Sequence, residues 1–139
     1  MRLFLSFLGI ILFSASCTEK EVLTTNLRSN LIGEWEYILA TTQIGQSGVE
    51  NTYYREGWIH INEDGTGEES TLFSINSAFE WSYQNDPPKI TKIPVTIISV
   101  VDTSVTYDIT IYESEVQEWY NESTFNNDKI IDTWSLTKK

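Results

Sequence analysis

The sequence is poor in the residues that usually build disulfides, metal sites and nucleic-acid surfaces. It has one cysteine, Cys17, and one histidine, His60, so no disulfide forms within the chain and no Cys/His cluster holds zinc. Lysine and arginine number 9 against 20 aspartates and glutamates, and the formal net charge is −11. We expect no nucleic-acid partner, because that binding requires basic clusters. The negative charge favours solubility.

The chain also lacks an apolar run long enough to cross a bilayer, which takes about 20 residues. The apolar run at residues 3–13 follows the positive charge of Arg2 and precedes the small residues Ser14, Ala15 and Ser16. A short positive region, a short apolar region and a small-residue region are typical of a secretory signal. We therefore expect residues 1–16 to be a signal peptide that is removed.

Cys17 follows the small residues directly, and this arrangement resembles the lipobox of bacterial lipoproteins, although Ser14 stands where leucine is usual. In that family the cysteine is acylated and becomes the first residue of the mature protein. The resemblance implies lipid attachment at Cys17 and a membrane partner reached through its acyl chains. Several chains are needed for a stable anchor, because one chain binds only marginally. The alternative is an ordinary secretory peptide that leaves a free thiol.

Residues 18–21 are polar and charged, and residues 22–30 show no clear periodicity, which indicates that 17–30 is a tether between the lipidated cysteine and a folded domain at 31–139. Inner-membrane lipoproteins of Gram-negative bacteria commonly carry aspartate after the cysteine, whereas this chain has Thr18. The resemblance therefore implies the outer membrane of a Gram-negative cell envelope, facing either the periplasm or the cell surface.

Apolar and polar residues alternate over most of 31–139, which predicts β-strands. In the stretch 105–111, Val105, Tyr107 and Ile109 share one face, and polar residues occupy the other. Asp64-Gly65 predicts a tight hairpin turn. The other strands are expected at 35–39, 59–61, 72–75, 79–83, 90–101, 116–120 and 130–136. The sequence predicts an all-β fold, an eight-stranded antiparallel up-and-down β-barrel, since closure removes exposed sheet edges.

Four short motifs, in order along the chain, resemble those of bacterial lipocalin-like lipoproteins. They are the Gly-x-Trp opening at 33–35, Asp-Gly-Thr-Gly at 64–67, Trp-x-Tyr at 81–83 and the closing Trp-x-Leu-x-Lys at 134–138. The Thr-Asp-x-x-Arg loop and the C-terminal helix of secreted lipocalins are missing. The resemblance implies a lipocalin-like β-barrel domain that binds a small hydrophobic or amphipathic molecule at the cell envelope.

Aromatic residues fall into two groups of candidates. The resemblance implies that Trp35 packs to close the base of the barrel, and the same structural closure is expected of Gly33, Trp134 and Leu136. Residues on strands that run towards the open end or the middle of the barrel are candidates for ligand binding, because their polar tips need partners when buried. These are Trp81, Tyr83, Tyr107 and Trp119. The sequence leaves open whether the interior is filled or hollow.

Catalytic and metal sites find little support. His60 is expected on the outer face of its strand, with no nucleophile motif nearby, so we expect neither an enzyme nor a cofactor. The acidic turn at 62–69 lacks the EF-hand spacing, which favours a solvated turn over a metal site. Two functions stay open. One is a binding module for a small apolar or amphipathic ligand; the other is a structural or interaction lipoprotein with a filled barrel and an envelope protein partner.

The anchor gives the first testable prediction. Cys17→Ser removes the sulfur that would carry the acyl chains, so we expect the protein to leave the membrane fraction and to lose labelling by a fatty-acid probe. Fractionation and metabolic labelling in the host measure both. Unchanged fractionation would refute the lipoprotein interpretation.

Overall fold

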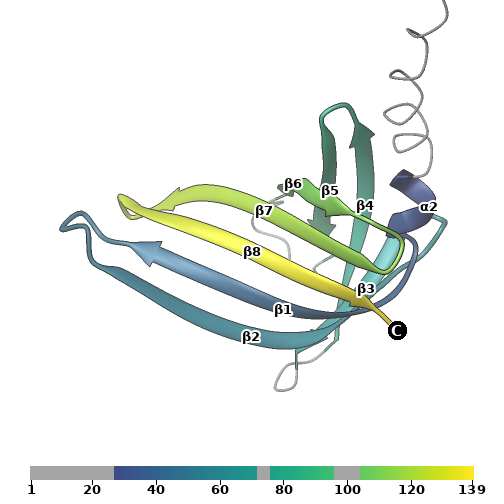
Figure 1. The fold of residues 1–139 in the computed structure, drawn as a ribbon, viewed down its shortest axis with the longest axis horizontal. Helices are drawn as coiled ribbons and strands as arrows, with labels where there is room; N and C mark the ends of the chain where they lie inside the picture. Colours follow the sequence, from purple (N-terminus) through teal and green to yellow (C-terminus); the bar gives the residue numbers. More distant parts are fainter. Residues whose placement is uncertain (1–26, 72–75, 96–103) are drawn as a thin grey trace, which may run out of the picture.

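A closed eight-stranded barrel is the architecture of the computed structural model, which describes residues 27–71, 76–95 and 104–139 (Figure 1). The elements are α2 (Leu27–Leu31), β1 (Gly33–Ile44), β2 (Glu50–Ile61), β3 (Thr66–Thr71), β4 (Ser77–Asn85), β5 (Pro88–Pro94), β6 (Val105–Tyr112), β7 (Val116–Phe125) and β8 (Asp128–Lys138). Each strand pairs antiparallel with the next, and β8 pairs with β1. The predicted eight-stranded antiparallel β-barrel is confirmed.

Some element boundaries differ from the sequence expectations. The third strand is β3 at Thr66–Thr71, whereas the strand expected at 72–75 lies outside the described residues. The strand β3 begins at Thr66 because Asp64 accepts hydrogen bonds from the backbone N–H and the hydroxyl of Thr66, and these bonds close the turn. The signal peptide, Cys17 and residues 96–101 also lie outside the described residues. No helix in the described ranges is long and apolar enough to span a bilayer.

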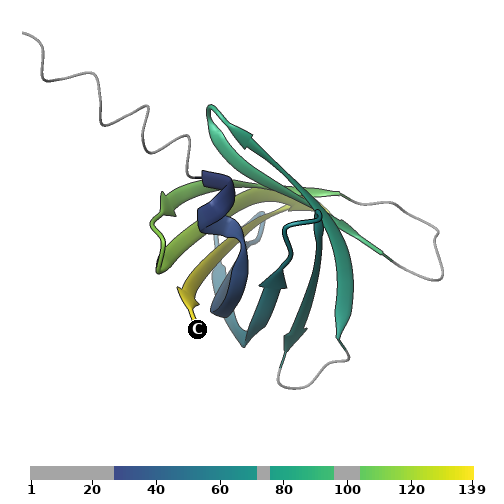
Figure 2. The same cartoon turned by 90° about the vertical axis from the view of Figure 1, so that its right-hand side faces the viewer.

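The helix α2 lies across one end of the barrel (Figure 2) and belongs to the core. Its residues Leu27 and Leu31 are 1% and 0% exposed. The Asn30 side chain donates to the Tyr112 carbonyl at 3.1 Å, and Gln117 donates to the Asn30 carbonyl at 2.8 Å. Residues 27–30, which the sequence analysis assigned to the tether, are therefore part of the packed domain and close this end of the barrel.

Below α2 the barrel interior is filled with side chains. Trp35 is fully buried, and its indole N–H donates to the Leu31 carbonyl at 2.9 Å. Trp119 is also fully buried in the core and donates to Gln117 at 2.9 Å, and its ring centroid lies 6.1 Å from that of Trp134. Ile59, Ile61 and Leu136 complete this layer. We call this part, next to α2, the closed half of the barrel.

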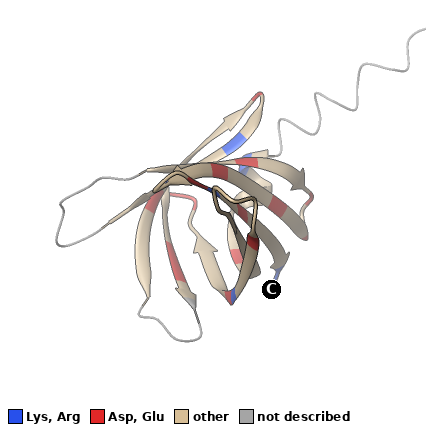
Figure 3. Ribbon diagram, turned by 90° about the vertical axis from the view of Figure 1, so that its left-hand side faces the viewer, with Lys and Arg blue, Asp and Glu red and all other residues tan. Residues whose placement is uncertain are grey.

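The strands are unequal in length, so one side of the barrel extends beyond the other (Figure 1). Within the described residues, β2 pairs with β3 only from Gly57 to Ile61, and the stretch Glu50–Glu56 of β2 pairs with β1 alone. The two hairpins β1–β2 and β7–β8 therefore project as a four-stranded sheet. Seen from that end, acidic residues are spread over several strands (Figure 3).

Gln117 gives a prediction about stability. It is fully buried, donates to Asn30 and accepts from Trp119, so Gln117→Leu removes the partner of the buried Trp119 N–H and of the partly buried Asn30 carbonyl. We expect the free energy of unfolding to fall by about 2–4 kcal/mol, measured by urea denaturation. The control Gln46→Leu, in the exposed turn after β1, should change it by less than about 0.5 kcal/mol. Equal effects of the two variants would contradict this role of Gln117.

Candidate functional site

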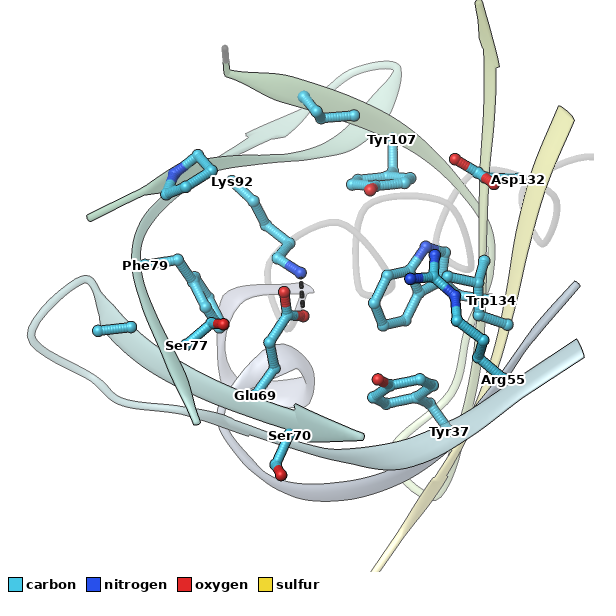
Figure 4. A pocket seen from close by; sticks show the side chains of 14 residues that line it. Tyr37, Arg55, Glu69, Ser70, Ser77, Phe79, Lys92, Tyr107, Asp132 and Trp134 are labelled. Carbon is cyan, nitrogen blue, oxygen red and sulfur yellow. Dashed lines mark hydrogen bonds and ion pairs between the residues drawn. The ribbon is translucent and has the colours of Figure 1, made fainter. Parts of the chain in front are cut away.

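The other half of the barrel is hollow. Beyond the closed half, moving along β1 away from α2, the interior holds a cavity of about 300 Å³ (Figure 4). This volume is at the lower end of the range for small-molecule sites. The lining residues are Tyr37, Leu39, Arg55, Glu69, Ser70, Ser77, Ala78, Phe79, Lys92, Pro94, Val105, Tyr107, Asp132 and Trp134. They come from seven of the eight strands, all except β7.

Aromatic rings form much of the cavity wall. The Trp134 ring lies at the centre, with its centroid 4.5 Å from that of Tyr37 and 5.9 Å from that of Tyr107. Tyr37 reaches this position because β2 has glycine opposite it. A Cβ on Gly57 would lie 2.8 Å from the Tyr37 hydroxyl oxygen and 2.0 Å from the Ser70 carbonyl oxygen. The rings therefore form a wall fixed by close packing.

A buried ion pair crosses the cavity. The Lys92 side chain is only 8% exposed and pairs with Glu69, whose side chain is 28% exposed (Figure 4). Its Nζ also lies 4.5 Å from the Trp134 ring centroid and 4.8 Å from that of Phe79. Burial lowers the pKa of Lys92, and the charge of Glu69 opposes that change. The ammonium is thus held by one carboxylate and two aromatic faces.

Three further groups present hydrogen-bonding atoms to the cavity. Burial raises the pKa of Tyr37 and of Tyr107, so both carry neutral hydroxyl groups at neutral pH. The Trp134 indole N–H is buried and has no hydrogen-bond partner in the described part of the chain. It lies close enough to the Tyr107 hydroxyl to moderate the rise in the pKa of Tyr107, yet it makes no hydrogen bond of normal geometry. Trp134 therefore offers an unused donor.

Arg55 and Asp132 add one charge of each sign to the lining. Asp132 accepts a hydrogen bond from the Thr41 hydroxyl at 2.6 Å. Arg55 lies on the exposed part of β2, and its guanidinium makes no ion pair or hydrogen bond among the described residues. The two carboxylates of the cavity each accept a hydrogen bond, whereas Arg55 and the Trp134 N–H donate none to the residues that the structure describes.

The structure brings only one of the four expected ligand-binding residues into this cavity, namely Tyr107. Trp119 packs in the closed half. Trp81 and Tyr83 instead line a shallow depression near α2, together with Arg28 and Glu63. The Trp81 indole donates there to two backbone carbonyls of the hairpin, at 3.0 and 3.1 Å, which accounts for its position. Ligand contact by any of these residues stays a prediction.

The four residues expected to close the barrel lie at different depths. Trp35 and Leu136 are buried in the closed half. Gly33, at the start of β1, has a φ of +136°, and a Cβ there would meet the Lys138 side chain. Trp134, by contrast, lines the cavity. The difference follows from its place on β8, where it lies opposite Leu39 of β1, whereas Leu136 lies opposite Tyr37, nearer α2.

Sequence reasoning missed Lys92, Glu69, Arg55 and Tyr37 as cavity residues. A signal for Lys92 was present, because Ile90 and Lys92 alternate along β5 and both point inward. A lysine on the apolar face of a strand is rarely buried without a partner. Glu69 and Arg55 gave no comparable signal, since each lies in a strand segment with few apolar neighbours.

The remaining polar candidates form no site in the described residues. His60 is half-buried between Ile59 and Ile61 of β2. The hydrogen bonds from Thr66 lower the pKa of Asp64, so this exposed carboxylate at the turn is charged at neutral pH. Within the ranges that the structure describes, no three histidine, cysteine or acidic side chains gather as metal ligands.

No protein-family model and no curated protein matches this sequence. The fold defines the protein as an all-β, eight-stranded closed barrel with a cavity in one half.

The ion pair gives a prediction. Lys92→Met leaves Glu69 unpaired in a largely buried position, so we expect a loss of about 2–3 kcal/mol in the free energy of unfolding. Combining it with Glu69→Gln should recover part of that loss, which a double-mutant cycle measures. The control Lys89→Met breaks the exposed pair with Asp108 and should cost less than about 1 kcal/mol. A Lys92→Met loss no larger than the control would contradict the assignment.

Proposed function

We propose that this protein is a membrane-anchored, lipocalin-like lipoprotein whose barrel binds one small hydrophobic or amphipathic molecule at the cell envelope. The observation that carries the proposal is the division of the interior into a filled half and a hollow half. Packed protein interiors leave few voids larger than a water molecule, so a cavity of about 300 Å³ needs an explanation. A ligand of small-molecule size is the simplest one.

The cavity wall has the composition of a small-molecule site. Aromatic rings supply apolar contact area, and a few polar atoms stand among them. Such a wall suits a molecule with an apolar body and one polar group. The proposal includes neither catalysis nor a cofactor, and it places the anchor at acylated Cys17, in accord with the signal-like leader at 1–16.

One observation favours the second candidate, an interaction lipoprotein that contacts another envelope protein. The projecting hairpins carry large exposed side chains, with Tyr53, Tyr54 and Phe125 exposed by 59%, 72% and 67%. Aromatic side chains exposed in this way are enriched at protein interfaces. The cavity still favours the binding module, because a filled interior would be sufficient for a barrel that acts only through its outer surface.

Phenylnaphthylamine, a neutral dye that brightens in apolar surroundings, tests the proposal. We expect the domain to bind it, and Val105→Trp to weaken that binding at least about tenfold. Val105 lies on the inward face of β6 and lines the cavity, so the larger side chain fills the space that the dye needs. Fluorescence titration measures the affinity, and urea denaturation verifies that the variant folds.

The matched control is Thr106→Trp, the next position on the same strand. Thr106 is exposed and bonds Thr91 across the outer surface, so the same indole added there should leave dye binding unchanged. No binding by the unmodified domain would contradict the binding function. Binding that survives Val105→Trp would show that the dye lies elsewhere.

A further inference from the structure

We propose that the cavity selects an organic anion, a small molecule with an apolar body and a carboxylate or similar oxyanion, over neutral and cationic molecules of the same shape. This inference rests on the proposed binding function and adds the charge of the ligand. It comes from a buried donor of the cavity wall that has no partner in the described part of the chain, and from the cation that already occupies the aromatic faces.

The cavity wall contains one buried donor, the Trp134 indole N–H, that has no hydrogen-bond partner among the described residues. Trp134 is 4% exposed, its N–H has no hydrogen-bond partner within the described ranges, and an indole N–H only donates. The neighbouring Tyr107 hydroxyl lies on the same side of the cavity (Figure 4) and can also donate. A buried donor without a partner is costly, so a ligand that brings acceptor oxygens to this place removes that cost. A carboxylate supplies two such oxygens.

Arg55 gives a second reason to expect an anion, although the two cations and two carboxylates of the lining balance one another in number. Lys92 forms an ion pair with Glu69, and the Asp132 carboxylate, which keeps its charge, accepts a hydrogen bond from the Thr41 hydroxyl. Arg55 is left without an ion-pair partner among the described residues. Its guanidinium presents N–H groups in the planar geometry that carboxylates accept in pairs. Arg55 also lies on the exposed stretch of β2, at the rim of the cavity, where it meets an entering anion.

An organic cation fits this cavity poorly, although aromatic walls usually attract cations. The two ring faces that would hold it, those of Trp134 and Phe79, already lie within 4.5 and 4.8 Å of the Lys92 ammonium. A second positive charge in the cavity would be repelled by Lys92 in a site of low dielectric constant. The Lys92 ammonium therefore occupies the faces of the Trp134 and Phe79 rings, and the Trp134 N–H is the group that a ligand with acceptor oxygens would bind.

A matched trio of ligands tests the selectivity. Phenylbutyrate, phenylbutanol and phenylbutylamine share one apolar body and differ in the charge of the end group at neutral pH. Each competes with phenylnaphthylamine for the intact domain, and loss of dye fluorescence gives its affinity. We expect phenylbutyrate to bind at least about tenfold more tightly than phenylbutylamine, with the affinity of phenylbutanol between the two.

Two variants assign the selectivity to named atoms. Trp134→Phe keeps a ring but removes the donor, and Arg55→Gln removes the guanidinium charge at the rim. Each should weaken phenylbutyrate roughly tenfold and change phenylbutanol by less. Lys129→Gln removes the same charge from the outer surface, where Lys129 pairs with Glu122, and should leave the affinity unchanged. Arg55→Gln keeps the test informative if Trp134→Phe does not fold, because Arg55 is exposed.

The outcomes separate this inference from the proposed function. Equal affinities for the trio, or an order with the amine first, overturn the anion selectivity and leave dye binding intact. Dye binding that none of the three displaces overturns it as well. Failure of the unmodified domain to bind the dye is a different result, and it contradicts the binding function itself.

Discussion

The pairing of β1 with β8 is the contact on which the rest of the structure depends. The ladder runs from Trp35 opposite Lys138 to Ile44 opposite Lys129, and it turns a meander of eight strands into a closed barrel. Closure removes two sheet edges in the barrel and creates an inside, which side chains, water or a ligand must fill. Each inward-facing residue is then placed by its distance along the strand from the end that α2 covers.

The contents of the barrel interior change with distance from the end that α2 covers. Near α2, large apolar side chains and the buried Gln117 fill the space, and hydrogen bonds tie the helix to the strands. Further along, the inward positions hold the Lys92–Glu69 ion pair and aromatic residues, which line the cavity. A buried ion pair seldom stabilises a fold more than apolar side chains of similar size would. The proposed binding function gives this ion pair a role in the hollow half that stability alone does not.

The barrel could be predicted from the sequence because period-2 alternation is strong in stretches such as 105–111, and the structure has β6 there. The helix α2 could not, since five residues carry too little pattern and its stability comes from packing against the barrel. Trp134 was expected to close the barrel because it belongs to the same closing motif as Leu136. Which depth each occupies depends on strand register, and register is set by contacts across the whole barrel.

The indole N–H signals of the tryptophans test the division of the barrel most directly, using nitrogen-15 NMR of the domain with and without phenylbutyrate. The N–H groups of Trp35 and Trp119 donate to protein acceptors in the closed half, so their signals should stay in place. The N–H of Trp134 has no partner among the described residues, so the proposed binding predicts that its signal moves as phenylbutyrate is added. Movement of the Trp35 or Trp119 signals while that of Trp134 stays fixed would contradict a cavity centred on Trp134.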